Sequence, residues 1–478
     1  MSAYIGIGGG VKSVSKMYVG VDGKAHQVQK AYIGVNGVAK LWYQRGPLLG
    51  DYDVGKTVKI AVDGKDYDWI VVHQGIPDAG IYDASCNGTW VLMKDIYTTS
   101  IFNNRNVGDS YKNSVIDSYL NNTFLPLLDT DIRAVIKQGK IPYQNVSGNA
   151  ESIATGSNGL STKVFLLSGY EVGWTTSDDG HFPKDGAKLD YFGKSSGGNS
   201  KRIAYKDGSA AEWWLRSPEN RYGLIWTVIS SGSSGSWDFY TTCGVRPALI
   251  LPQDVLMDDT GHIRTQLGWL NVGSTVKMDI NGNKRVWRIA YKGNPNPDIY
   301  DSSCNGVWLV LNTIYSTRAN GNDCQYAGGI IDTYLNSTFL NRIDKTGNAA
   351  KYIKDIKIPY AKKQDDGSWE VQTKENGLPC KVFLPSVFEI GGSENSSVYK
   401  DGSALGYYDG SPSTLTLKQS GTPAAWRTRT VTSDAQSEFS VDASGTITTC
   451  APTDVIGVVP CVIMRPDALV ENGIIIGE

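Results

Sequence analysis

The chain repeats one long stretch of sequence almost completely. An ordered set of motifs in residues 54–249 returns in residues 272–469. The paired motifs are VGKTVKI and VGSTVKM (54–60 and 272–278), DSYLNNTFL and DTYLNSTFL (117–125 and 332–340), KIPY (140–143 and 357–360), and KVFLLSGYEVG and KVFLPSVFEIG (163–173 and 381–391). The period, on the order of 200 residues, is far longer than the roughly 20–50 residues of a solenoid repeat. The sequence therefore predicts a tandem duplication of a whole domain.

The duplication sets the expected domain boundaries. RPAL at residues 246–249 is matched to RPDAL at 465–469, which closes each repeat. We expect a first repeat at 50–252, a linker at 253–267, a second repeat at 268–470 and a tail at 471–478. An enzyme rarely needs two copies of one domain, whereas a binding or scaffolding protein gains avidity from them.

Composition and charge narrow the class of protein. The 478 residues include 54 Gly, 26 Tyr and 13 Trp but four His, which favours short strands, turns and aromatic packing. A formal net charge of −2 without a run of Lys or Arg argues against a nucleic-acid surface. The first residues show no signal peptide, and no stretch approaches the roughly 18 apolar residues of a membrane span. We expect synthesis in a cytoplasm and no membrane insertion.

The residue types that could bind a metal ion do not have the spacing of a metal site. Seven cysteines include no CxxC pair and no matching His spacing, so we expect buried, reduced thiols. Asp83 and Asp301 occupy equivalent places in the two repeats, but no acidic cluster accompanies them as a Ca²⁺ site requires. The sequence therefore predicts neither a metal nor a cofactor.

A shorter repeat opens the chain. A Tyr-Ile/Val-Gly motif begins at Tyr4, Tyr18 and Tyr32, and Gly-Gly, Asp-Gly or Asn-Gly follows each copy. Asp-Gly and Asn-Gly are strong signals for hairpin turns, because both central residues of a type I′ turn need positive φ. Residues 1–46 are thus predicted to form a meander of about six short strands. A sheet this small buries little, so we interpret it as an assembly module in a homotrimer, with Tyr4, Tyr18, Tyr32 and Trp42 as contacts. An ordinary N-terminal subdomain is the alternative.

Each long repeat has the pattern of an α+β domain with few helices and many loops. Apolar residues recur at helical spacing in residues 114–124 and 330–339, and a further helix is predicted at 131–137. Ser168 and Glu171 have the spacing of a capping box, which predicts a short helix after Ser168. The fold class expected is α+β, with an N-terminal β-hairpin meander and two loop-rich tandem domains.

The end of the first repeat carries a family resemblance. WWLRSP at 213–218, followed by a Gly/Ser-rich region and GVRPAL at 244–249, resembles a family of uncharacterised domains common in Gram-positive bacteria and their phages. This ending is also similar to the C-type-lectin-like fold of formylglycine-generating-enzyme relatives and phage variable receptor-binding proteins. In the second repeat AWRTRT at 425–430 replaces WWLRSP and VIMRP at 462–466 replaces GVRP. The resemblance implies that the second repeat keeps the fold but has an altered or lost site.

A search for catalytic residues finds no shared constellation. His73, His181 and His262 have no counterpart in the other repeat, where Tyr291 stands at the place of His73, so a common His-based mechanism is excluded. Asp178-Asp179 lies in a Gly-flanked loop and is interpreted as a solvated turn. We expect no enzyme.

Two further residue sets, three cysteines and two arginines, are not interpreted as functional sites. Formylglycine-generating catalysis needs dedicated cysteines, and Cys243, Cys450 and Cys461 are not in matching positions. Arg216 and Arg246 are interpreted as buried arginines whose charge-assisted hydrogen bonds tie the terminal strands together.

One region has the composition of a binding surface. Between residues 218 and 243 aromatic residues alternate with Ser, Gly, Asn and Arg, the residue types that dominate antibody paratopes. The alternative is that Trp226, Trp237 and Phe239 point into the core, which leaves only Tyr222, Asp238 and Tyr240 outside. The corresponding stretch 433–449 has only one aromatic residue, which indicates that the repeats bind different ligands. The predicted ligand-binding residues are Asn220, Arg221, Tyr222, Trp237, Asp238 and Tyr240.

These observations favour a virion protein of a phage or phage-tail-like particle. Its partners would be other virion proteins, contacted through residues 1–46, and a glycan or protein on the host cell surface. Two positions compete: a receptor-binding tail fibre or baseplate tip, and a decoration or head-fibre protein on the capsid. A bacterial surface adhesin is a third possibility, against which the missing export signal argues.

Overall fold

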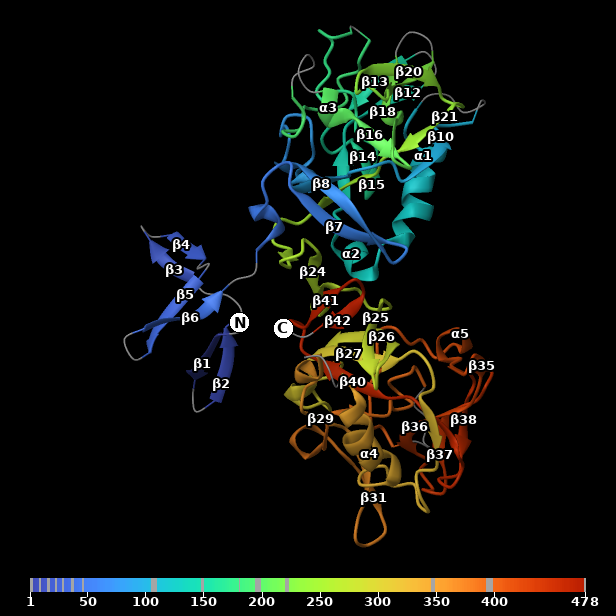
Figure 1. Ribbon diagram of the computed structural model, residues 1–478. Coiled ribbons are helices and arrows are strands. Elements are labelled where there is room, and N and C mark those ends of the chain that lie inside the picture. Colours follow the sequence, from blue (N-terminus) through green and yellow to red (C-terminus); the bar gives the residue numbers. More distant parts are fainter. Residues whose placement is uncertain are drawn as a thin grey trace. The chain divides into compact units, whose positions relative to one another are not determined.

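The computed structural model divides into two compact units, Met1–Thr265 and Gln266–Glu478 (Figure 1). Strands greatly outnumber helices, so the protein is mostly β-sheet with few helices. The structure describes residues 3–7, 10–14, 18–21, 24–27, 30–35, 38–44, 47–104, 110–147, 150–179, 181–193, 199–219, 223–344, 349–392 and 399–476.

The first unit is built on two five-stranded sheets. One has the strand order β15-β22-β9-β8-β7 and the other β10-β21-β18-β19-β20. Every residue of β9 and β22 is buried, as expected for apolar strands covered on both faces. The strands are β7 Thr57–Val62, β8 Lys65–Gly75, β9 Gly88–Met93, β10 Thr98–Ile101, β15 Val164–Phe165, β18 Trp213–Glu219, β19 Leu224–Val228, β20 Ser234–Asp238, β21 Thr242–Val245 and β22 Ala248–Leu251.

The second unit has the same arrangement, which confirms the tandem duplication. Its sheets contain the orders β33-β40-β27-β26-β25 and β28-β39-β36-β37-β38, which match the first unit strand for strand. The strands are β25 Thr275–Ile280, β26 Asn283–Gly293, β27 Gly306–Leu311, β28 Ser316–Arg318, β33 Val382–Phe383, β36 Trp426–Val431, β37 Glu438–Val441, β38 Ile447–Cys450, β39 Ile456–Val458 and β40 Cys461–Met464.

The helices predicted at 114–124, 330–339 and 131–137 are present, and two of them change pitch halfway. α1 (Val115–Tyr119) and α4 (Ile330–Tyr334) each continue as a π-helical turn, Leu120–Phe124 and Leu335–Phe339. The helix predicted at 131–137 is α2 (Thr130–Val135).

An asparagine lies in each π-helical turn and joins the helix to a strand. Asn121 donates hydrogen bonds from Nδ2 to the backbone oxygens of Asp117 and Val164, at 3.1 and 3.0 Å. Asn336 makes the equivalent bonds to Asp332 and Val382. The repeated motif around these asparagines is therefore explained by helix–sheet packing.

The structure corrects the sequence match at the end of the repeats. Met93 N donates to Pro247 O and Leu311 N donates to Pro460 O, so these two prolines are equivalent. Arg246 therefore corresponds to Val459, and the RPDAL motif at 465–469 lies beyond the matched strand. The sequence match followed an Arg-Pro dipeptide, whereas the fold conserves a buried strand, and just before that strand a buried, apolar Val459 replaces the arginine.

The WWLRSP match shifts by one residue. Trp213 pairs with Gly244 and Trp426 pairs with Gly457, both in parallel register. Arg429 is therefore the counterpart of Arg216, and Arg427 takes the place of the buried Trp214.

Residues 253–267 are not a linker, and most of 471–478 is not a free tail. β23 (Leu256–Met257) pairs with β24 (Ile263–Gln266), and His262 bridges to Lys59 on β7. In the second unit β41 (Leu469–Glu471) pairs with β42 (Ile474–Ile476), which bridges to β25. The physical reason is burial: Met257, Ile263, Val470 and Ile475 are all buried.

The N-terminal residues form separate hairpins instead of one meander. Among the described residues of the segment 1–46, strand pairing occurs only within β1–β2, β3–β4 and β5–β6. A two-residue turn fixes the pairing inside a hairpin but not between neighbouring hairpins. The turn pairs at 8–9, 22–23 and 36–37 and the side chains of Tyr4, Tyr18, Tyr32 and Trp42 lie outside the described part of the chain. The strands are β1 Ala3–Ile7, β2 Gly10–Val14, β3 Tyr18–Val21, β4 Lys24–Gln27, β5 Lys30–Val35 and β6 Val38–Gln44.

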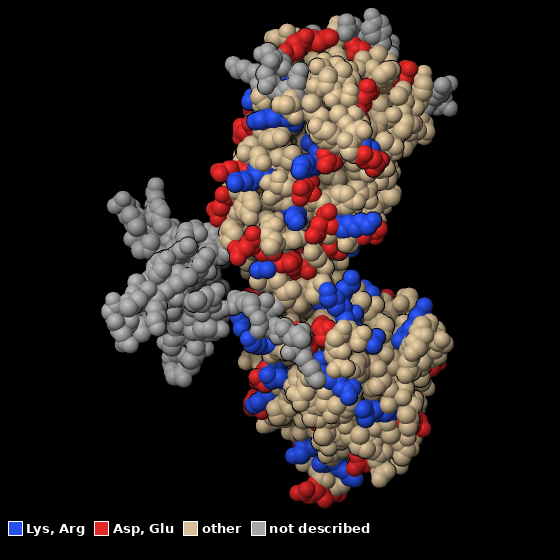
Figure 2. Space-filling view, viewed as in Figure 1, with Lys and Arg blue, Asp and Glu red and all other residues tan. Residues whose placement is uncertain are grey.

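The state of the cysteines and the distribution of charged side chains agree with the sequence analysis. All seven cysteines are free thiols and six are buried, as predicted, while Cys450 is partly exposed. Acidic and basic side chains are interspersed on the visible face of the first unit (Figure 2). No helix within the described ranges has the length and apolar character needed to cross a bilayer.

Candidate functional site

Arg216 and Glu171 form a buried ion pair inside the first unit. Arg216 lies on β18 and donates to Glu171 Oε1 and Oε2, each at 2.6 Å, and neither side chain is exposed to solvent. Its remaining N–H groups donate to the backbone oxygens of Pro142, Leu166 and Asp185. All five donors of the guanidinium group are therefore used.

Glu171 is held from two further directions. Tyr82 donates from its hydroxyl to Glu171 Oε1 at 2.7 Å. Ser168 N donates to Glu171 Oε2 and Glu171 N donates to Ser168 Oγ, at 2.9 and 3.2 Å, which confirms the capping box. A turn follows in place of the predicted helix, because Gly173 adopts a positive φ of 94° and ends the helical path.

Burial sets the protonation of the groups around this pair. Burial, and after it the charge of Glu171, raises the pKa of the Tyr82 hydroxyl well above its usual value. Burial alone would lower the pKa of Arg216, but the charge of Glu171 raises it. Burial also raises the pKa of Asp185 to about 7, against the opposing effects of Arg216 and the Ser217 hydroxyl. The network therefore holds a charged arginine, a neutral tyrosine and a second carboxyl that titrates near neutrality.

The raised pKa of Asp185 predicts a pH-dependent stability. Between about pH 4, the ordinary carboxyl value, and about pH 7, folded Asp185 keeps a proton that the unfolded chain releases, so its contribution to stability falls as the pH rises. Relative to the natural chain, Asp185→Asn is expected to become steadily more stable across this window and to change no further above it. Denaturant unfolding from pH 4 to 8 measures this difference, and a constant difference would contradict the assignment.

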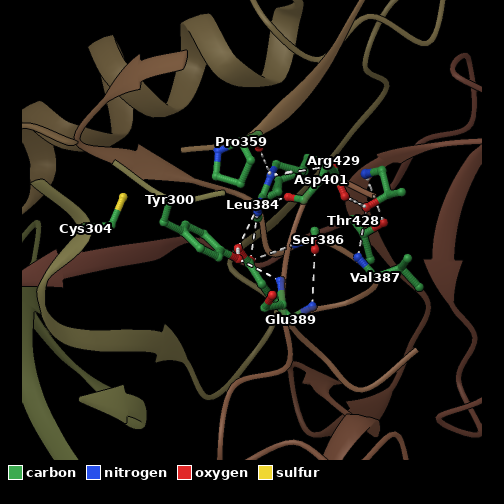
Figure 3. A network of polar contacts seen from close by, with 12 residues as sticks. Tyr300, Cys304, Pro359, Leu384, Ser386, Val387, Glu389, Asp401, Thr428 and Arg429 are labelled. Atoms are coloured by element: carbon green, nitrogen blue, oxygen red, sulfur yellow. Dashed lines mark hydrogen bonds and ion pairs between the residues drawn. The ribbon is translucent and has the colours of Figure 1, made fainter. Parts of the chain in front are cut away.

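The second unit repeats the network (Figure 3). Arg429 donates to Glu389 Oε2 and Oε1 at 2.8 and 2.7 Å, and Tyr300 donates to Glu389 Oε1 at 2.7 Å. Arg429 also donates to the backbone oxygens of Pro359, Leu384 and Asp401. The arginine, glutamate and tyrosine are therefore all kept in the second unit, although the surrounding sequence motif differs.

The two networks are built to hold the fold together. Their ionised groups are fully buried and each guanidinium is surrounded by carboxylate and backbone oxygens, so a substrate cannot reach them. The interpretation of Arg216 as a fold determinant is confirmed. Arg246 has the same role, since it donates to Met93 O and Lys94 O and lies over the Trp213 ring at 4.8 Å.

The predicted binding residues divide into described and undescribed groups. Asn220, Arg221 and Tyr222 lie outside the described residues. Trp237 and Asp238 lie on β20, at the edge of the sheet, and Tyr240 follows shortly after.

The exposed fractions decide which aromatic residues belong to the core. Trp226 is buried and stacks on Phe182 with ring centroids 4.0 Å apart. Trp237 and Tyr240 are 44% and 39% exposed. Trp237 donates from its indole N–H to Glu212 Oε2 at 2.6 Å, which fixes the ring in place. The core alternative is therefore correct for Trp226 and wrong for Trp237.

The loop carboxylates have local structural partners. Asp83 and Asp301 each accept a hydrogen bond from a backbone N–H two residues on, at Ser85 and Ser303, and thus cap short helical turns. Asp178 and Asp179 likewise accept from Thr175 N and His181 N. These bonds account for the acidic residues without a ligand.

Sequence reasoning missed an aromatic pair in the second unit. Trp369 and Tyr399 lie 6.4 Å apart, measured between ring centroids, and line an open pocket of about 440 Å³. Trp369 and Tyr399 are far apart in the sequence, so no local motif contains both. The one available signal was an isolated tryptophan in the polar segment QDDGSWE at 364–370.

The comparisons with known proteins place the chain in a family. The model of the family described as "Domain of unknown function (DUF6273)" matches residues 87–253 and 305–466. These two tandem matches cover more than half of the chain, which therefore belongs to this family. No curated protein and no solved structure matches it.

Proposed function

We propose that this chain, which carries the DUF6273 domain in both repeats, is a recognition protein on the surface of a phage or phage-tail-like particle. Its two tandem domains are related to the C-type-lectin-like fold and are not enzymes. The first unit binds a glycan or protein of the host cell surface, as a tail fibre or baseplate tip does.

The observation that carries this proposal is the exposed aromatic edge of β20. Trp237, on the edge strand β20, and Tyr240, shortly after it, present large ring surfaces to solvent. Aromatic side chains offer contact area at low cost in conformational entropy, and they dominate the binding energy of many interfaces. Because the buried arginines and glutamates of the two networks are fully occupied with one another and with backbone oxygens, binding at the surface explains the arrangement better than catalysis there.

The rest of the proposal concerns display. Within the described residues the strands β1–β6 pair only inside their own hairpins, so the hairpin edges are available to join other virion proteins or further copies of the chain. Protein made in the host cytoplasm is then assembled on the particle. Capsid decoration remains the second candidate, and it predicts display without receptor binding.

Binding of the purified full-length chain to host cells tests the recognition step. Trp237→Ala and Tyr240→Ala are each expected to weaken binding by about thirtyfold, or ~2 kcal/mol, because each removes an exposed aromatic contact. Tyr205→Ala is a matched control, since Tyr205 is 48% exposed but lies on a different hairpin, β16 (Ala204–Lys206) with β17 (Ser209–Ala211). Equal binding by all variants would remove β20 as the binding edge.

A further inference from the structure

The pocket in the second unit lies between two elements that are distant in sequence. One wall is the hairpin β30 (Tyr360–Lys363) and β31 (Trp369–Gln372), and the other is the loop at residues 433–436 that follows β36. Its volume of about 440 Å³ falls in the usual range for a small-molecule site.

The aromatic lining of the pocket is rigidly supported. Trp369 and Tyr399 pack on a small separate core formed by Cys324, Ala361 and Val431. Tyr399 also donates from its hydroxyl to Ser433 O at 3.3 Å, which ties the ring to the opposite loop. The two rings are tilted by 33° to each other, so they form one continuous wall and not the sides of a cage.

The rim of the pocket carries polar groups of both kinds. Asp323 and Asp434 use Oδ1 to cap their own turns, by accepting from Gln325 N and Gln436 N, and Oδ2 has no partner among the described residues. Lys363 lines the pocket and forms no ion pair with any residue in the described ranges. The pocket thus offers two carboxylate acceptors and an ammonium donor beside an aromatic wall.

We propose that this pocket binds a neutral or amino pyranose unit of a glycan, with one face of the sugar ring on Trp369 and Tyr399. The C–H face of a pyranose is apolar and stacks on aromatic rings, while its hydroxyl groups meet the carboxylates and Lys363. Two carboxylates against one ammonium disfavour an acidic sugar. A lone cationic side chain fits less well, because the rings form a single wall whereas recognition of a cation favours a cage.

This site is additional to the one proposed on β20 and belongs to the second repeat alone. In the hairpin register of the first unit, Val146 and Glu151 stand where the second unit has Lys363 and Trp369. The first repeat therefore lacks both residues. The two repeats would bind different chemical groups, which agrees with the divergence of their loops.

An array of pyranose oligosaccharides with neutral, N-acetylated, amino and acidic members, probed with the full-length chain, tests the proposal. We expect binding to neutral or amino members, weakened at least about tenfold by Trp369→Ala and largely kept by Trp369→Phe. Tyr205→Ala serves as the control, because Tyr205 is exposed and belongs to neither proposed site, and it should leave this binding unchanged. The array tests the pocket through Trp369→Ala and cell binding tests β20 through Trp237→Ala, so a failure at one site is distinguished from a failure at the other.

A second variant covers a loss of folding. If Trp369→Ala lowers the melting temperature, Ser433→Phe decides, because it fills the pocket from an exposed loop position without removing either ring. Binding that survives Ser433→Phe would overturn the proposal. So would an array with no bound member, binding to acidic members alone, or capture of a lysine-rich peptide in place of any glycan.

Discussion

Replacing Arg216 with methionine is expected to lower the free energy of unfolding of the first unit by about 3–5 kcal/mol. The change leaves the Glu171 carboxylate without its partner at a position with no solvent exposure, and it removes three bonds to backbone oxygens. Because a typical domain is stable by about 5–15 kcal/mol, this single change removes much of the total. Denaturant unfolding followed by tryptophan fluorescence measures it.

Two comparisons make this prediction specific. Lys94→Ala breaks an exposed ion pair to Asp68, whose N–O distance is 3.5 Å, and should cost less than about 1 kcal/mol. Arg216→Met combined with Glu171→Leu should recover much of the loss, because no buried charge is then unpaired. If Arg216→Met costs no more than Lys94→Ala, the buried pair does not hold the fold together. Arg429→Met provides the matched test in the second unit.

Deleting residues 1–46 is expected to abolish incorporation of the chain into particles while leaving residues 47–476 folded. The sheets of both units are complete without β1–β6 within the described residues, so the deletion removes no strand from either core. Particle-associated protein is measured by immunoblot after purification of the particles. Circular dichroism and thermal unfolding of the truncated chain provide the folding control. Normal incorporation of a truncated, folded chain would show that the attachment surface lies elsewhere.

Much of the fold could be predicted because the duplication presents each local sequence signal in two copies. The helices at 114–124 and 330–339 and the capping box of Ser168 and Glu171 follow from residue spacing, whereas the π-helical turns do not. The C-terminal register could not be predicted, because sequence matching favours the repeated Arg-Pro pair. The structure instead conserves the buried strand, and Val459 replaces Arg246 just before it.

The candidate sites depend on side-chain direction, which composition does not give. Trp226 and Trp237 belong to one aromatic-rich segment, yet one stacks in the core and the other is exposed at the sheet edge. Residues on neighbouring antiparallel strands reach opposite faces according to a register that only the folded chain shows. Trp369 and Tyr399 come together through the tertiary fold alone, so no local sequence pattern predicts their pocket.

Adsorption of particles to host cells tests the central claim most directly. Particles that carry the chain with both Trp237→Ala and Tyr240→Ala are to be compared with natural particles of equal protein content. The recognition account predicts normal assembly and a clear loss of adsorption, while particles with Tyr205→Ala adsorb normally. Adsorption that is unchanged by the double variant would contradict receptor binding by this edge and favour a decorating role on the capsid.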